Sequence, residues 1–187
     1  ANTLAPAAGA TFLITFRLLR VIADVSNSPF YSRLPQLAKY RAAGNLTKLE
    51  TTAAGGMRLS LLVFAVGAAS LAAIGPLLLD WLDRDVTAPP TGFLLLVAAG
   101  FFVQRYAAMH LQLQSTTNEI IWHRVAAVTG SVYLLTLFLT LPPLGIYAFP
   151  TAMLVAYLGA YAPLSSYHSH QILAMKPWDL SLIHISE

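Results

Sequence analysis

Long apolar stretches alternate with short polar segments along the chain, and this pattern indicates the fold class. A transmembrane helix needs about 20 mostly apolar residues. Five stretches reach that length, at about residues 8–32, 57–82, 91–113, 121–141 and 145–168. The pattern therefore predicts an all-α protein, a polytopic transmembrane helix bundle of about five spans.

The first stretch differs from the others because it is too long for a bilayer and contains prolines. At about 1.5 Å per residue, a helix from residue 8 into the 30s extends well past a hydrocarbon core of roughly 30 Å. We expect its lower part to project into the cytoplasm. Pro29 and Pro35 should kink or interrupt it, since proline lacks the backbone N–H that a helix interior uses.

Composition places the chain in a membrane. Of the 187 residues, 57% are hydrophobic and only 10% are charged, whereas soluble domains have about 25% charged residues. The net charge of +3 is small, and no long basic run with interleaved aromatic residues is present, so nucleic acid is not an expected partner. The chain has no cysteine, which excludes disulfides, iron–sulfur clusters and thiolate zinc sites.

The basic residues predict the orientation, because Lys and Arg gather on the cytoplasmic side of a membrane protein. One side of the predicted spans holds seven of the 11 basic residues, namely Arg33, Lys39, Arg41, Lys48, Arg58, Arg124 and Lys176. The other side holds Arg84 among three aspartates. We therefore expect a multi-pass membrane protein whose first span enters from outside and whose Lys- and Arg-rich side is cytoplasmic.

A stripe of polar residues follows one face of the first span. Residues spaced by three or four share a helix face, and this face carries Arg17, Arg20, Asp24, Ser28 and Tyr31. The opposite face carries Phe12, Leu19, Ile22 and Ala23. Charges inside a bilayer cost roughly 2.5–3.5 kcal/mol each on insertion scales, and usually face protein or a water-filled cavity.

Two interpretations of the stripe remain open. In the structural one, Arg20 pairs with Asp24 and Arg17 extends its guanidinium to the outer surface. In the functional one, the stripe lines a cationic cavity, in which Asp24 orients Arg20 and both arginines contact an anion. A planar guanidinium suits phosphate, because it binds two oxygens at once.

Arg105 is a second charge inside a predicted span. It lies toward the cytoplasmic half of the third span and shares a face with Met109 and Gln112. It either reaches the inner headgroups or lines the same cavity as Arg17 and Arg20. In the second case the three arginines form an anion path.

The remaining polar residues do not indicate a metal site or a catalytic site. His168 and His170 are two residues apart and do not face each other on a helix, so we expect no metal site there. We interpret His110 and His123 as interfacial. No catalytic motif, phosphate loop or paired-carboxylate spacing occurs, so we expect no enzyme, no catalytic residue and no cofactor.

Three segments resemble a known family. In "NSPFYSRLPQLAKYRAAGNLTKLE" (Asn27–Glu50), a proline precedes small and apolar residues, then a Gly-Asn pair and a leucine-containing amphipathic stretch. "SLAAIGPLLLDWL" (Ser70–Leu82) and "LPPLGIYAFPTAMLVAYLGAY" (Leu141–Tyr161) are similar to a later helix end and a later hairpin. The family is the polysaccharide (lipid-linked oligosaccharide) flippase branch of the multidrug/oligosaccharidyl-lipid/polysaccharide exporter superfamily. The segment "STTNEIIWHR" (Ser115–Arg124) departs from it, since the family often has a Gly-Arg or Gly-Lys turn there.

The resemblance implies a transporter of 12–14 spans in two similar halves. Residues 1–180 then form part of the transmembrane domain, and we favour the second half. Residues 181–187, "SLIHISE", resemble a translated sequencing-adaptor tail and are expected to be non-native. The implied function is to move a polyprenyl-pyrophosphate-linked glycan across the inner membrane. Its implied partners are that glycan, membrane lipids and the missing half of the same chain. The candidate cavity residues are Arg17, Arg20, Asp24, Ser28 and Arg105.

Other functions remain as alternatives. A cation-coupled multidrug exporter of the same superfamily should be rich in carboxylates, whereas Asp24 is the only acidic residue deep in a predicted span. A membrane-embedded glycosyltransferase or polymerase normally has a long extramembrane loop, and the predicted loops are short. A scaffold without transport activity would need a partner subunit to cover the polar stripe.

Overall fold

A computed structural model describes residues 6–81, 89–117 and 121–173, and in this part of the chain every regular element is helical. The elements are α1 (Pro6–Ser26), α2 (Ser28–Tyr31), α3 (Leu34–Ala42), α4 (Leu46–Trp81), α5 (Thr91–Ser115), α6 (Trp122–Leu144), η1 (Gly145–Tyr147), α7 (Ala148–Ala156), η2 (Tyr157–Tyr161) and α8 (Ala162–Leu173). The predicted all-α class is confirmed. The tail at residues 181–187 lies outside the described residues.

The first predicted span is interrupted where its prolines occur. α1 ends at Ser26, and the chain continues as the short helices α2 and α3. Pro29 and Pro35 each lie in the first turn of one of these helices, where a missing N–H costs nothing because that group has no partner within the helix. The expected interruption is therefore confirmed.

The Gly-Asn pair after α3 separates two helices. Gly44 has a φ of +67°, a left-handed conformation that glycine adopts without a steric penalty. The amide of Asn45 then donates to the carbonyl of Tyr40, at 2.9 Å, which closes the helix end. The side-chain Oδ1 of Asn45 accepts from the amide of Lys48 at 3.1 Å and so caps the start of α4.

α4 begins earlier than the sequence predicts. The second span was expected to start at residue 57, but the helix starts at Leu46. Apolar content marks where a helix enters a membrane, whereas the cap at Asn45 determines where the helix begins. Residues 46–56 therefore extend the helix beyond its most apolar part.

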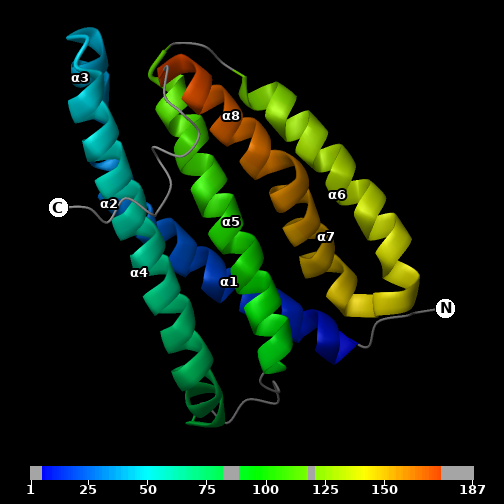
Figure 1. The fold of residues 1–187 in the computed structure, drawn as a ribbon. Coiled ribbons are helices and arrows are strands. Elements are labelled where there is room, and N and C mark those ends of the chain that lie inside the picture. The colour runs from blue at the N-terminus through cyan, green and yellow to red at the C-terminus, as the bar shows by residue number, and fades with distance from the viewer. Residues whose placement is uncertain (1–5, 82–88, 118–120, 174–187) are drawn as a thin grey trace.

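The last two predicted spans form a helical hairpin. α6 continues through Pro142 and Pro143 to Leu144, a few residues beyond its predicted end. Gly145 then adopts a φ of +54°, and the chain reverses direction through η1. α7 and η2 return along α6, and α8 continues beside α5, as Figure 1 shows.

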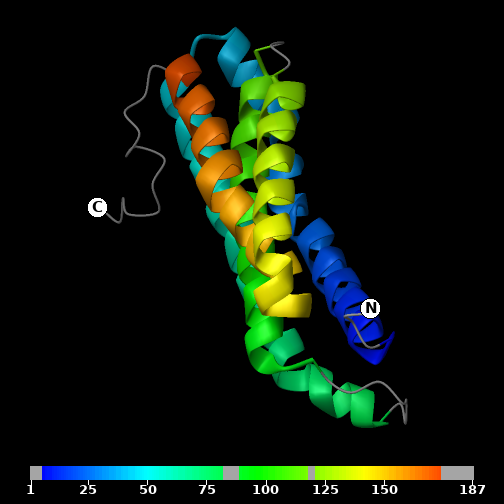
Figure 2. The same ribbon diagram turned by 90° about the vertical axis from the view of Figure 1, so that its right-hand side faces the viewer.

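α5 is the central helix of the bundle. It packs against α1, α4, α7 and α8, while α1 runs obliquely across α4 and α5 (Figures 1 and 2). One apolar core joins α2, α3 and α4 to α5 around Phe30, Leu49 and Met109. A second core joins α1, α4 and α7 to α5 around Leu19 and Phe101.

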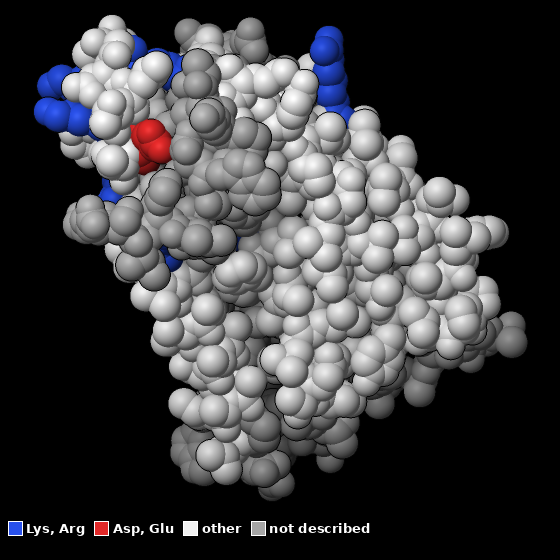
Figure 3. Space-filling view, viewed as in Figure 1, with Lys and Arg blue, Asp and Glu red and all other residues white. Residues whose placement is uncertain are grey.

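Three helical segments among the described residues are long and apolar enough to cross a membrane. They are Leu46–Gly75, Thr91–Ser115 and Trp122–Gln171, the last of which contains the hairpin turn. Figure 3 shows one face of the molecule, on which the charged side chains gather at the end formed by α3 and by the starts of α4 and α6. The rest of that face is almost uncharged where it is described, as expected of a membrane protein.

Candidate functional site

The polar stripe of α1 lies on the surface, and its apolar face is buried. Arg17, Arg20 and Asp24 are exposed, whereas Leu19 and Ala23 are fully buried. The Nε of Arg20 lies 3.5 Å from the Oδ2 of Asp24, so the predicted intrahelical pair is confirmed. With both side chains more than half exposed, this pair contributes little stability, since exposed ion pairs are worth about 0–1 kcal/mol.

Arg105 does not reach toward headgroups. Its side chain is buried, with 5% of its surface exposed, and one terminal guanidinium nitrogen donates a hydrogen bond to the Oδ1 of Asn27. Asn27 lies in the link between α1 and α2. The bond therefore ties the centre of α5 to the end of α1, and the headgroup interpretation of Arg105 is wrong.

Arg105 contacts the chain next to the charges of α1. Its hydrogen-bond partner Asn27 follows Asp24 by three residues, and Asp24 pairs with Arg20. Arg17 precedes Arg20 by one helical turn on the same exposed face. We call Arg17, Arg20, Asp24 and Arg105 the arginine cluster. It holds three positive charges and one negative charge, so it carries an excess of positive charge.

Ser28, the fifth predicted cavity residue, is the first residue of α2 and is exposed. Its backbone carbonyl accepts a hydrogen bond from the amide of Ser32 at 3.0 Å. No described contact joins its hydroxyl to the arginine cluster. Its part in the site therefore stays a prediction.

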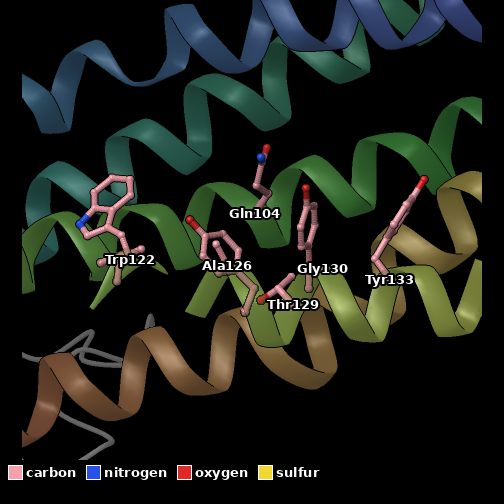
Figure 4. A pocket seen from close by; sticks show the side chains of 9 residues that line it. Gln104, Trp122, Ala126, Thr129, Gly130 and Tyr133 are labelled. Atoms are coloured by element: carbon pink, nitrogen blue, oxygen red, sulfur yellow. The ribbon is translucent and has the colours of Figure 1, made fainter. Parts of the chain in front are cut away.

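A cavity of about 290 Å³ lies between α5, α6 and η2. Figure 4 shows Gln104 from α5 and Trp122, Thr129 and Tyr133 from α6 around it. The full lining is Gln104, Leu111, Trp122, Ala126, Thr129, Gly130, Tyr133, Tyr157 and Tyr161. The cavity thus combines aromatic rings with hydroxyl and amide groups.

Tyr157 and Tyr161 line this cavity, and Tyr157 also packs against the apolar core that includes Leu19 of α1. Both belong to η2, a turn of π-helix, and such turns often occur at functional sites. The cavity therefore lies beside α1, the helix that carries the exposed arginines.

A buried polar group between α5 and α8 was not predicted from the sequence. His110, which was interpreted as interfacial, is fully buried, and the Oγ of Ser169 lies 2.7 Å from its Nδ1. The ring of His170 is buried beside it, and Gln114, one helical turn further along α5, is buried as well. A signal was present, because His110 and Gln114 are four residues apart, as are Ser165 and Ser169. Such spacing indicates polar faces on two apolar helices.

The described residues contain no group of three or more His, Cys, Asp and Glu side chains placed to hold a metal ion. Comparisons of the chain with protein-family profiles, with curated proteins and with solved structures give no match.

Proposed function

We propose that the chain is part of a flippase that moves a polyprenyl-pyrophosphate-linked oligosaccharide across the bacterial inner membrane for polysaccharide export. The observation that carries the proposal is that charged groups of two helices are joined through Asn27. Buried Arg105 on α5 is hydrogen-bonded to Asn27, three residues after Asp24, which in turn pairs with Arg20 on α1. An excess of positive charge beside apolar helices suits an anionic headgroup whose lipid tail stays in the bilayer.

The chemistry of guanidinium supports pyrophosphate as the anion. Arg17 and Arg20 are exposed, so their planar forks are accessible to phosphate oxygens. Asp24 orients Arg20 through their ion pair at 3.5 Å. Arg105 adds positive charge from the interior of the bundle, since it is buried and hydrogen-bonded to Asn27.

The neighbouring cavity suits the sugar next to the pyrophosphate. Its volume of about 290 Å³ is at the lower end of ligand pockets, which measure roughly 300–1,000 Å³. Tyr133, Tyr157 and Gln104 line it. These side chains supply rings against which a sugar packs, and hydroxyl and amide groups that bond to sugar hydroxyls.

The proposed arrangement in the membrane has about five spans. α1, α4, α5, α6 and the α7–α8 segment run alternately up and down in Figure 1. The end with α3 and the starts of α4 and α6 is basic (Figure 3), and we place it in the cytoplasm. In this proposal the bundle faces a second, similar half, and the two halves rock around a midplane site to give alternating access.

Export measured in cells tests the proposal. In cells that depend on this transporter, the double substitution Arg17→Ala/Arg20→Ala should abolish surface polysaccharide while the amount of protein in the membrane stays unchanged. Arg124→Ala is the matched control, because Arg124 is an exposed arginine at the start of α6. Normal export by the double variant would refute the proposal.

The cavity lining favours one second candidate, a multidrug exporter for aromatic cations. The rings of Trp122, Tyr133, Tyr157 and Tyr161 line the cavity, and aromatic faces attract cations. The arginine cluster opposes this function because it repels cations. Resistance to a cationic dye that is lost in Tyr133→Ala but kept in Arg17→Ala/Arg20→Ala would favour the drug exporter over the flippase.

A further inference from the structure

The buried group between α5 and α8 has no part in the proposed function. His110 and Gln114 come from α5, and Ser169 and His170 come from α8. Figure 1 shows these two helices side by side. All four side chains are more than nine-tenths buried. The ring centres of His110 and His170 lie 5.5 Å apart. We call these four residues the histidine group.

The hydrogen bonds of the histidine group assign the protons of both rings. The Nδ1 of His170 lies 2.6 Å from the carbonyl oxygen of Ser166, which only accepts, so this Nδ1 carries the hydrogen. The hydroxyl of Ser169 donates to the same carbonyl at 3.0 Å. Its oxygen therefore accepts from the Nδ1 of His110 at 2.7 Å. Each neutral ring then has a lone pair on Nε2.

Both Nε2 atoms are buried and have no hydrogen-bond partner among the described residues. The amide nitrogen and oxygen of Gln114 are in the same state, one turn from His110 on the same face of α5. An unpaired buried polar group costs about 1–3 kcal/mol. Several such atoms in one place indicate a site for a species that binds to nitrogen and oxygen lone pairs.

We propose that the histidine group binds a transition-metal ion of the zinc class between α5 and α8, through the Nε2 atoms of His110 and His170 and the amide oxygen of Gln114. With Zn–N distances of about 2.0–2.1 Å, the ring centres of two histidines on one zinc ion lie roughly 5–5.5 Å apart at angles of about 105–120°. The observed 5.5 Å fits this range. Imidazole nitrogen is a preferred ligand of zinc, copper and nickel.

The surroundings have the features of an outer ligand shell. A metal-binding histidine usually donates its other N–H to a carbonyl, carboxylate or water, which fixes the ring. His170 donates to the carbonyl of Ser166, and His110 donates to the hydroxyl of Ser169. Three protein ligands leave a fourth position for water. The metal then links the end of α5 to the end of α8 and holds the two helices together.

Zinc binding to the purified full chain in detergent tests the proposal, with free zinc and bound zinc measured after equilibrium dialysis. We expect one zinc ion per chain. His110→Gln and His170→Gln should each weaken binding at least tenfold. The matched controls are His168→Gln, which removes a half-buried histidine of the same helix, and His123→Gln, which removes an exposed histidine of α6. Both should bind zinc as the unchanged protein does.

Other outcomes would overturn the site. One is that the protein sample retains no more zinc than detergent without protein. Another is that His168→Gln weakens zinc binding as much as His110→Gln or His170→Gln does. Should a variant lose helicity by circular dichroism, X-ray absorption of the zinc-loaded unchanged chain decides the question. The site requires two imidazole ligands in that spectrum, and a spectrum without imidazole refutes it. If the histidine group titrates with pH but the chain retains no zinc, its Nε2 atoms bind a proton, and the metal site is refuted.

Discussion

The bond between Arg105 and Asn27 allows a quantitative prediction, because it joins the centre of α5 to the end of α1. The perturbation is Asn27→Ala, made alone and in an Arg105→Met background. Asn27 occupies the cap position of α2 but makes no side-chain capping bond. Removing its side chain therefore tests the bond to Arg105 without removing a helix cap.

The magnitude follows from the burial of Arg105. A hydrogen bond to a charged group contributes about 1.5–3 kcal/mol, and its loss leaves a buried charge less satisfied. With 5% of Arg105 exposed, Asn27→Ala should lower the free energy of unfolding by about 1.5–3 kcal/mol. Arg105→Met removes the charge and keeps an apolar chain of similar reach, so it should cost less than that or stabilise the bundle.

The double variant isolates the bond. In the Arg105→Met background, Asn27→Ala should cost only about 0.5 kcal/mol, so the coupling energy is at least about 1 kcal/mol. Unfolding in mixed micelles, followed by far-ultraviolet circular dichroism, measures all four proteins. Gln104→Met, at the neighbouring position of α5, is the control and should be additive with Asn27→Ala. An equal cost of Asn27→Ala in both backgrounds would refute the reasoning.

Two further substitutions test the helix contacts. A Cβ at Gly67 would lie 2.6 Å from the Cγ2 of Ile22, a stiff β-branched side chain, so Gly67→Ala should lower the free energy of unfolding by about 1–3 kcal/mol. Gly75→Ala on the same helix, where the nearest atom is 3.5 Å away, should be nearly neutral, and equal effects would contradict the close packing of α1 on α4. Asn45→Ala removes the bond to the amide of Lys48 at 3.1 Å and should cost about 0.5–2 kcal/mol in the same unfolding assay. Asn45→Asp should restore most of that stability, and an Asn45→Asp variant no more stable than Asn45→Ala would argue against the cap.

The part of the fold that depends on local sequence could be predicted. Pro29 and Pro35 interrupt the first helix because a missing N–H acts locally. The pairing of Arg20 with Asp24 depends only on helical spacing. The burial of Leu19 and Ala23 opposite the charged face follows from the same periodicity. These features need no knowledge of what packs against the helix.

The incorrect predictions concern contacts between distant segments. The headgroup alternative for Arg105 is wrong because the side chain is buried and its partner Asn27 is 78 residues away in the chain. His110 was interpreted as interfacial because a single histidine among apolar residues carries no indication of its neighbours. Its burial depends on Ser169 and His170 in α8. Only the packing of α5 against α8 brings these side chains together.

The most direct test of the account is whether the arginine cluster binds a lipid-linked pyrophosphate. The purified chain in nanodiscs is titrated with a polyprenyl pyrophosphate and with the matching uncharged polyprenol, and intrinsic tryptophan fluorescence reports binding. The account predicts tighter binding of the pyrophosphate. It also predicts at least about a tenfold loss in Arg17→Ala/Arg20→Ala, the equivalent of about 1.4 kcal/mol, and no loss in Arg124→Ala. Equal affinity for the two lipids, or equal affinity of the unchanged chain and the double variant for the pyrophosphate, would contradict it.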